Sequence, residues 1–363
     1  MKNQRELFDL PDEVAYFNCA YTAPLLKSAQ AAGRRAIADK AVPWTITADD
    51  FFTTLERARG LFGRLVGATV DDVAIIPAAS YGVALAARNV TVEQGQKIIV
   101  LAEQFPSHVY AWRKLARKTG AVINTVARPT HGGWTRAVLA ETDENTAVVA
   151  IPNCHWTDGS LVDLEAVGEK CRAVVAALVV DGTQSLGAMP LDVKKVQPDI
   201  LVTTAHKWLL GPYSFGFCYV APHRQDGEPL EENWFNREGA QDFSRLVDYR
   251  DQYQPGARRF DVGEASNFIL ASIAIAAMEQ IMAWGVENIS AALGEKTVLI
   301  AQSAQQLGLT SPPKEQRAAH MLGLSRPGGL PADLLPRLAR RNIYVSARGE
   351  AIRVSPHLYN TDE

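Results

Sequence analysis

Two residues of the sequence, Asp181 and Lys207, have the types and the spacing that cofactor chemistry requires. Asp181 directly follows the apolar run from Ala176 to Val180, and Lys207 comes shortly after a second run from Asp199 to Val202. Apolar runs that end in polar residues are typical of buried parallel strands, whose carboxyl ends carry the chemistry of α/β proteins. Pyridoxal phosphate requires a carboxylate that keeps its ring nitrogen protonated and an amine that forms a Schiff base. The pair therefore predicts a pyridoxal-phosphate enzyme.

Both residues also allow an ordinary structural interpretation. Lys207 could be a solvated loop lysine, and Asp181 could open a turn, because Asp-Gly pairs often begin one. A lysine in otherwise apolar sequence is costly to bury unless it is paired or used, which favours the cofactor role. Two neighbours of the acid fit that role. Gln184 could donate a hydrogen bond to the phenolic oxygen of the cofactor, and Thr183 could pack on one face of its ring.

A phosphate group requires backbone N–H groups at the start of a helix, together with hydroxyl groups. The segment 77–86 joins a predicted strand to a predicted helix and offers both, with Ser80 as the hydroxyl and Gly82 allowing a close approach. Thr204 and His206, beside the lysine, are the other candidates for phosphate binding. His206 could equally be a structural histidine, so this prediction depends on its place next to Lys207.

The elements that must position these residues alternate between strand and helix through about residue 220. This alternation predicts an α/β fold whose three-layer α/β/α large domain has a mainly parallel sheet. The predicted strands are 73–76, 97–101, 121–126, 147–151, 176–180 and 199–202, and the predicted helices are 26–65 with a break near Pro43, 78–89, 109–119 and 164–171.

The remainder of the chain has a different pattern of polar and apolar residues. Residues 224–258 are polar and irregular, and two long helices follow, over 267–284 and then to about residue 307. Short apolar runs at 320–324 and 342–345 suit a small α+β domain at the C-terminus. We therefore expect a large domain over 16–255 and a small domain formed by 1–15 and 256–363.

Composition excludes several classes of protein. The 363 residues carry a formal net charge of −3, so a basic field for nucleic acid is absent from the sequence. Four scattered cysteines without a CxxC pair argue against a zinc site and a disulfide scaffold, and no metal site is expected. Since the sequence also lacks a signal-peptide pattern and an apolar run of ~18 residues, we expect a cytoplasmic protein that does not enter a membrane.

Several further motifs accompany the acid and the lysine. They are Tyr16-Phe-Asn-Cys-Ala-Tyr-Thr-Ala-Pro, Ala79-Ser-Tyr-Gly, Glu103-Gln-Phe-Pro-Ser, Asp181-Gly-Thr-Gln, Thr204-Ala-His-Lys, Arg259-Phe-Asp-Val-Gly and Arg353-Val-Ser-Pro-His-Leu-Tyr-Asn-Thr. Together they resemble the class V aminotransferase family of fold-type I pyridoxal-phosphate enzymes. That family also contains cysteine desulfurases, isopenicillin-N-epimerase-like proteins and kynureninases. Asp-x-x-Gln followed by His-Lys is the specific part of the resemblance, which extends through nearly the whole chain.

The resemblance implies a role for each matching residue. Lys207 would form the Schiff base, Asp181 would partner the ring nitrogen and Gln184 would face the phenolic oxygen. The other cofactor-binding residues that it implies are Ser80, Tyr81, Phe105 (stacked on the ring), Thr183, Thr204 and His206. The substrate-binding residues that it implies are Arg353, which would grip a carboxylate with a bidentate fork, and Tyr21, Trp156 and His155. Enzymes of this fold type generally build each site from two subunits, so a homodimer is also implied.

The chain departs from the family pattern at three positions. Desulfurases carry a nucleophilic cysteine on a loop shortly before the C-terminal arginine, whereas residues 343–353 contain no cysteine. Trp156, with His155 nearby, stands where many relatives have an asparagine, as in the epimerase-like branch. Glu264 stands near the place where relatives bring a threonine across the dimer to the phosphate, and its charge would repel that group.

The sequence predicts an enzyme that acts at Cα of an amino acid through an external aldimine, with Lys207 as the proton shuttle. Transamination is the reaction that the family resemblance favours, and epimerisation or elimination stays open. A carbon–sulfur lyase that uses His108 or His155 is an alternative, and a non-catalytic protein that binds pyridoxal phosphate is another. A nucleotide-binding α/β protein is disfavoured, because neither GxGxxG nor GxxxxGK[ST] occurs in the sequence.

Overall fold

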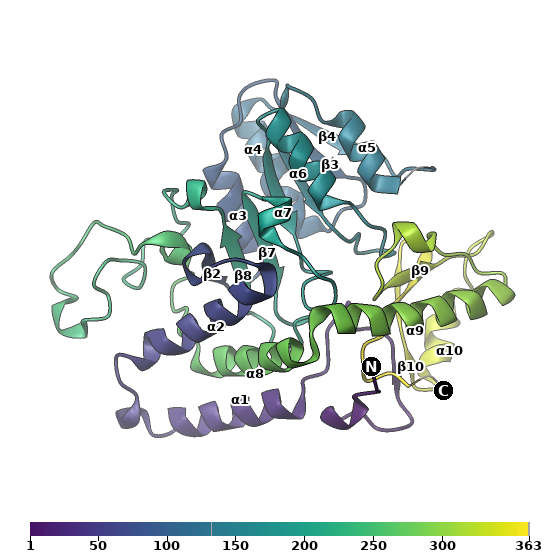
Figure 1. Ribbon diagram of the computed structural model, residues 1–363, viewed down its shortest axis with the longest axis horizontal. Helices are drawn as coiled ribbons and strands as arrows, with labels where there is room; N and C mark the ends of the chain where they lie inside the picture. The colour runs from purple at the N-terminus through teal and green to yellow at the C-terminus, as the bar shows by residue number, and fades with distance from the viewer. Residues whose placement is uncertain (132, 362–363) are drawn as a thin grey trace.

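A seven-stranded sheet forms the centre of the protein, in a computed structural model that describes residues 1–131 and 133–361 (Figure 1). Its strand order is β2-β8-β7-β6-β5-β3-β4. In that order the strands are β2 (Val73–Ile76), β8 (Gly216–Val220), β7 (Ile200–Thr204), β6 (Ala177–Asp181), β5 (Thr146–Pro152), β3 (Lys97–Leu101) and β4 (Val122–Val126).

The sheet is mainly parallel, as the sequence predicts, but β8 is an exception. This strand pairs antiparallel with β7 on one side and with β2 on the other. Only residues 205–215 connect β7 to β8, and they contain no helix. A parallel return requires a crossover of a dozen or more residues, so the chain turns back on itself instead. The turn carries Lys207.

Helices cover both faces of the sheet and confirm the predicted three layers. Successive strand residues alternate between two apolar cores, with Leu178 and Val180 on one face and Ala177 and Val179 on the other. The first core contains residues of α1 (Lys27–Lys40), α2 (Asp50–Val66), α5 (Gly133–Glu141), α6 (Leu164–Ala173), α7 (Val193–Val196) and α8 (Phe268–Trp284). The second contains residues of α3 (Ala79–Asn89) and α4 (Tyr110–Thr119).

Helix α5, the short helix α7 and strand β8 are elements of this domain that the sequence does not predict, and α5 is the longest of them. It has nine residues, and only Trp134 and Val138 among them are buried. So short an apolar stripe gives a weak helical period, and packing against the sheet determines the conformation instead.

The small domain is α+β, as predicted, and lies at one side of the large sheet (Figure 1). An antiparallel three-stranded sheet has the order β11-β12-β9, and a separate parallel pair joins the N-terminal β1 to β10. The elements are β1 (Ala15–Tyr16), α9 (Val286–Gln306), β9 (Leu322–Leu324), α10 (Leu334–Ala339), β10 (Ile343–Tyr344), β11 (Ser346–Arg348) and β12 (Ala351–Val354).

Helices α8 and α9 connect the two domains. Helix α8 packs on α1 and α2 of the large domain, whereas α9 packs on β9 of the small domain. The division predicted at residue 255 stays a prediction, although these contacts place the change of partner near Gly285. Within the described residues, no single helix is long and apolar enough to cross a membrane. The pair α8 and α9 passes that test together but is bent by 77°.

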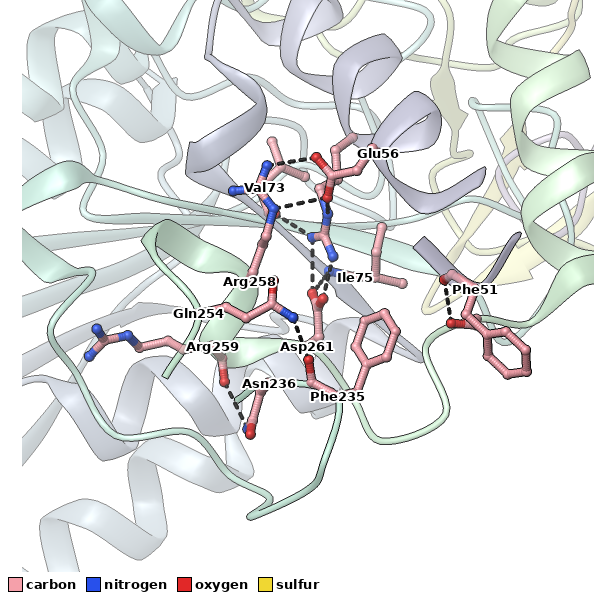
Figure 2. Close-up of polar contacts among 12 residues, drawn as sticks. Phe51, Glu56, Val73, Ile75, Phe235, Asn236, Gln254, Arg258, Arg259 and Asp261 are labelled. Atoms are coloured by element: carbon pink, nitrogen blue, oxygen red, sulfur yellow. Dashed lines mark hydrogen bonds and ion pairs between the residues drawn. The ribbon is translucent and has the colours of Figure 1, made fainter. Parts of the chain in front are cut away.

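A buried ion pair fastens the motif around Asp261 to the sheet (Figure 2). Arg59 of α2 contacts both carboxylate oxygens of Asp261, and each side chain is 1% exposed. The same carboxylate accepts a hydrogen bond from the backbone N–H of Ile75 in β2 at 2.8 Å. Glu56 bridges Arg59 to Arg258, at 3.1 and 2.6 Å. This cluster fixes β2, and β2 leads directly into the start of α3.

We predict that Asp261→Ala lowers the free energy of unfolding by about 3–5 kcal/mol, because it removes the buried partner of the Arg59 guanidinium and leaves only the part-exposed Glu56. Urea denaturation of the full chain measures the change. Asp226→Ala is the matched control: its carboxylate is fully exposed and lies 3.7 Å from Arg259, so stability should stay essentially unchanged. Equal midpoints for the two variants would contradict the role of the buried pair.

Candidate active site

A cavity of about 260 Å³ lies at the carboxyl ends of β5, β6 and β7, next to the start of α3. This is the edge of a parallel sheet at which ligands of α/β proteins bind. The residues that line it are Pro77, Ala78, Ala79, Ser80, Gln104, Phe105, Ser107, His108, Pro152, Cys154, Trp156, Asp181, Thr183, Gln184, Thr204, His206, Lys207, Tyr213 and Ser214. Two residues named from the sequence, Asp181 and Lys207, are therefore brought together here.

Lys207 is an almost fully buried amine, with 9% of its surface exposed. Burial lowers the pKa of Lys207 to about 8, although the carboxylate of Asp181 acts in the opposite direction. Its Nζ lies 5.4 Å from the centroid of the Phe105 ring. Asp181 is also buried, and its Oδ1 accepts a hydrogen bond from the backbone N–H of Thr183 at 2.9 Å. The cavity thus holds an amine that is easily deprotonated beside a fixed carboxylate.

The turn that carries Lys207 is held in an unusual backbone conformation. Leu210 and Ser214 have φ values of 53° and 59°, in the left-handed region that non-glycine residues seldom adopt. Two backbone hydrogen bonds hold the turn, from Leu210 N to Lys207 O at 3.0 Å and from Gly211 N to Ala205 O at 2.8 Å. Such conformations cost free energy and persist only where the surrounding structure enforces them, which is common at functional sites.

Gln184 is fixed by partners from three parts of the chain. Its Nε2 donates to the carbonyl of Ala20 at 3.2 Å, and its Oε1 accepts from the indole N–H of Trp208 at 3.0 Å. Its backbone carbonyl contacts Nε2 of His320 at 2.6 Å. The amide is therefore oriented before any ligand binds, and one hydrogen of its NH₂ group remains for a ligand in the cavity.

The start of α3 provides an anion-binding site. The N-cap residue is Ala78, whose side chain cannot satisfy the first backbone N–H groups of this helix. Ser80 is exposed to the cavity, and the buried Oγ1 of Thr204 has no hydrogen-bond partner within the described chain. His206 lines the same cavity, and burial lowers its pKa to about 4, so its ring is neutral at pH 7.

The expected role of Gly82 needs correction. A Cβ added there would come within 2.4 Å of the Val202 side chain in β7. Gly82 therefore allows α3 to approach the sheet, and it does not itself approach a bound phosphate. Glycine is still required at this position, because α3 and β7 come into close contact there. This contact lies on the side of the helix that faces the strand.

An aromatic wall closes one side of the cavity. Phe105 and Trp156 make an edge-to-face contact, with ring centroids 5.4 Å apart. The indole N–H of Trp156 donates to the carbonyl of Glu103 at 2.7 Å, and Arg128 holds the carboxylate of that glutamate at 2.7 Å. Trp156 is therefore fixed from two directions at the place where a substrate would enter.

His108 and Cys154 line the cavity without having been assigned to it from the sequence. His108 was considered only as an alternative base; both its ring nitrogens are buried, and neither has a partner among the described residues. Burial lowers the pKa of His108, while the nearby Asp181 raises it. Burial raises the pKa of the Cys154 thiol far above its ordinary value. The order of strands and helices in the sequence does not determine whether the side chains of His108 and Cys154 point into the cavity.

Arg353 lies behind Trp156 and does not line the cavity itself. It is 1% exposed, and its Nη1 donates to the carbonyl of Trp156 at 2.8 Å. Its Nε and Nη2 are buried and have no partner in the part of the chain that the structure describes. Burial lowers the pKa of Arg353 to about 9, and the nearby Arg348 acts in the same direction. Two unused N–H donors on a buried guanidinium are suited to a carboxylate.

Besides Arg353, three further site residues named from the sequence do not line the cavity. Both ring nitrogens of His155 are engaged, by Thr157 Oγ1 at 2.7 Å and by the carbonyl of Ala102 at 3.1 Å. A substrate-binding role for this fully buried side chain does not fit that placement. Tyr81 packs against the apolar core of α3 and α4. Tyr21 is 59% exposed and is electrostatically coupled to Arg348.

The comparisons with known proteins agree with this geometry. The family profile described as "Aminotransferase class-V" matches residues 45–362. The chain belongs to the class V aminotransferase family. This class V protein is 29% identical to the uncharacterized aminotransferase YcbU of Bacillus subtilis, over 85% of this chain and 80% of that protein. It is also 26% identical to isopenicillin N epimerase of Streptomyces clavuligerus, over 50% of this chain and 46% of that protein.

Solved structures show the same fold. A cysteine desulfurase from Thermococcus onnurineus superposes with a TM-score of 0.86 at 20% identity, covering 100% of this chain and 95% of that one. A C-DES variant with glycine covalently linked to its PLP cofactor superposes with a TM-score of 0.89 at 17% identity, covering 99% and 96%. These structures show the predicted fold, and membership of the class V family identifies the protein as a pyridoxal-phosphate enzyme. The predicted homodimer and the cytoplasmic location stay predictions.

The cavity of the class V enzyme fits this cofactor. The uncapped start of α3 and the unpartnered hydroxyl of Thr204 suit a phosphate group, and the buried carboxylate of Asp181 suits a protonated ring nitrogen. Lys207 supplies the amine, and the unpartnered Oγ1 of Thr183 lies in the same cavity. The sequence-predicted cofactor residues that line the cavity are therefore Ser80, Phe105, Asp181, Thr183, Gln184, Thr204, His206 and Lys207.

We predict that Thr204→Val weakens the binding of pyridoxal phosphate to the class V enzyme by about 10- to 100-fold, the value of one hydrogen bond to a charged group. Equilibrium dialysis against the cofactor measures the dissociation constant. Thr203→Val is the matched control, because its hydroxyl contacts the carbonyl of Thr204 at 3.4 Å and the residue does not line the cavity. Similar losses in both variants would remove Thr204 from the phosphate site.

We also predict an unusual pH dependence for cofactor capture by the apoenzyme. Only the neutral amine attacks the cofactor aldehyde, and a pKa of about 8 leaves Lys207 neutral above that pH. The capture rate should therefore rise about fivefold from pH 7 to pH 8 and level off by about pH 9. Stopped-flow absorbance measures the rate, with Nα-acetyl-lysine as the unperturbed comparison. A rate that still rises through pH 10 would contradict the lowered pKa.

Proposed function

We propose that this enzyme is an aminotransferase that moves the amino group of a small amino acid to a keto acid. One observation supports the proposal above the others: the buried amine of Lys207 and the carboxylate of Asp181 line one cavity with Trp156, and the carbonyl of Trp156 holds Arg353, whose Nε and Nη2 donors are unused. An amine, an acid and a carboxylate clamp are the groups that chemistry at Cα requires.

Each residue has a distinct task in this reaction. Bound pyridoxal phosphate supplies an electron sink for the charge that develops at Cα. Asp181 holds the proton on the ring nitrogen, and Gln184 orients the opposite side of the ring through its fixed amide. Lys207, with its pKa near 8, can remove and return the proton at Cα close to neutral pH. Arg353 holds the substrate carboxylate so that Cα faces the lysine.

The cysteines support transamination over a sulfur relay. All four cysteines are free and buried, and none lies in the hairpin segment 343–353. Cys154 is the cavity residue among them, and burial keeps its thiol protonated, since its pKa is strongly raised. A thiol in that state is a poor nucleophile toward sulfur. A desulfurase-like reaction that relays sulfur through a cysteine therefore lacks a suitable thiol among the described residues.

The experiment is a screen of the holoenzyme against the L-amino acids, with and without a keto-acid acceptor. Transamination predicts that a substrate bleaches the visible band of the bound cofactor and yields one keto acid per site without ammonia. Adding a second keto acid should restore the band. Release of ammonia would indicate elimination, release of sulfide would indicate carbon–sulfur cleavage, and racemisation of the substrate would indicate epimerisation. Each of these outcomes would overturn the proposed transamination.

Variants connect the activity to the lysine. Lys207→Ala should lower turnover by about 10²–10⁴-fold or more, because it removes the proton carrier at Cα. It should also abolish the bond that borohydride traps between protein and cofactor. Lys194→Ala, which removes an exposed lysine of α7, should leave both measurements unchanged. A fully active Lys207→Ala variant, or a holoenzyme that no amino acid bleaches, would overturn the proposed function.

A further inference from the structure

The hairpin of β11 and β12 places two arginines on one face of the small sheet. In its register, Ser346 pairs with Arg353 and Arg348 pairs with Ala351. Side chains two residues apart on a strand share a face, and paired residues do as well. Arg348 and Arg353 are therefore diagonal neighbours on the same face, with Cβ atoms roughly 7–8 Å apart.

This face lies against the loop that follows β5. Gly323 of β9 pairs with Arg353, and a Cβ added at Gly323 would meet that of Asp158 at 2.6 Å. Trp156, in the same loop, contacts both arginines. Its ring centroid lies 5.5 Å from Cζ of Arg348, and its carbonyl accepts the hydrogen bond from Nη1 of Arg353. Since Trp156 also lines the cavity, both guanidinium groups lie next to the cavity wall.

Several donors on this face have no partner. They are Nε of Arg348, Nε and Nη2 of Arg353 and Oγ of Ser346, all of them buried atoms. Nη1 of Arg348 donates only to the carbonyl of its neighbour Ala347, at 2.6 Å. Buried donors without partners are rare in folded proteins, so a cluster of them indicates a ligand that supplies acceptors.

The charges around the face are also unbalanced. Within residues 1–131 and 133–361, neither arginine forms an ion pair with a carboxylate. Asp181 is the one carboxylate among the described residues that line the cavity; it accepts a hydrogen bond from the Thr183 N–H and raises the pKa of Lys207. Both arginines lower the pKa of Lys207, so their fields reach the reacting amine. Ser80 and Thr204, which would hold the phosphate of the cofactor, line the cavity, whereas neither arginine does.

One α-carboxylate satisfies one guanidinium group. Arg353, which is the more deeply buried and is fixed by the Trp156 carbonyl, suits that carboxylate. Arg348 is half-buried, its guanidinium lies over the Trp156 ring, and it interacts electrostatically with the exposed Tyr21, which places it closer to the solvent than Arg353. A second acceptor further along the substrate would reach it.

We propose that Arg348 binds a second acidic group of the substrate, so that the preferred substrate is an amino acid whose side chain ends in a carboxylate. The planar guanidinium on the Trp156 ring presents a flat pair of donors, which matches the two oxygens of a carboxylate. The inference rests on the proposed function for the identity of the substrate. The second arginine site can nevertheless be tested without turnover.

The test compares the binding of dicarboxylates and monocarboxylates to the holoenzyme by isothermal titration calorimetry. Glutarate and succinate occupy both arginine positions, whereas butyrate occupies one, and none of them carries an amine that could react. We expect the wild-type holoenzyme to bind the better dicarboxylate at least about tenfold more tightly than butyrate, the range for an added charge-assisted hydrogen bond. Arg348→Gln should remove this preference and leave butyrate binding within about twofold.

Two control variants complete the experiment. Arg341→Gln removes the same charge from an exposed position in the small domain and should keep the preference. Arg348→Lys keeps the charge without the planar fork and should restore only part of it. In parallel, the amino acids that bleach the cofactor band should include aspartate or glutamate ahead of asparagine or glutamine.

The outcomes separate the two proposals. Equal binding of dicarboxylates and butyrate by the wild type, or an unchanged preference in Arg348→Gln, would overturn the role of Arg348 whatever the reaction is. A preference that depends on Arg348, in a protein that no amino acid bleaches, would support the acidic subsite and overturn the proposed function alone.

Discussion

The in-register pairing of β6 with β7 is the constraint on which the site depends. It places Asp181 opposite Val202, so the acid at the end of one strand lies beside the strand that leads to the lysine. The buried amine is tolerable because that carboxylate is fixed close to it, and a one-residue slip would turn Asp181 to the opposite face of the sheet. Every other group of the cavity is arranged around these two side chains, from the start of α3 to the aromatic wall.

Much of this arrangement could be predicted from the sequence, because the signals are local. Apolar runs that end in Asp181 and Thr204 identify two buried strands, and the turn after Pro77 identifies the start of a helix. Since parallel strands end at one edge of a sheet, residues far apart in sequence meet there without any further information. That rule brought together all but one of the predicted cofactor residues, and the exception, Tyr81, follows Ser80 but packs on the core side of α3.

The remainder depends on side-chain directions that a sequence does not encode. His155 and Trp156 are neighbours, yet the first is stacked on Trp134 with a centroid distance of 5.3 Å and the second faces the cavity. The inward positions of His108 and Cys154 depend on how their loops close over the sheet. The reversed direction of β8 follows from a connection too short for a crossover. The alternation of strands and helices in the sequence does not reveal this reversed direction.

Electrostatics gives the two domains unequal roles. The large domain supplies Asp181, the one carboxylate among the described residues that line the cavity, and the anion site at the start of α3. The small domain contributes Arg348 and Arg353, which have unused hydrogen-bond donors. The hairpin that carries these arginines contains a left-handed turn at Gly349, with a φ of 57°. Binding of the substrate's acidic groups and the chemistry at the Lys207 amine thus depend on different domains. The substrate preference can therefore change while the chemistry is kept.

Hydrogen bonds of Gln184 connect the cavity of the large domain to the small domain and to the N-terminal segment. Its backbone carbonyl is tied to His320 of the small domain, its amide nitrogen to the N-terminal segment and its amide oxygen to the residue after Lys207. A rigid-body swing of the small domain would have to break the short His320 contact and would disturb the cofactor pocket in the same motion. The His320 contact therefore couples any movement of the small domain to the residue that faces the cofactor.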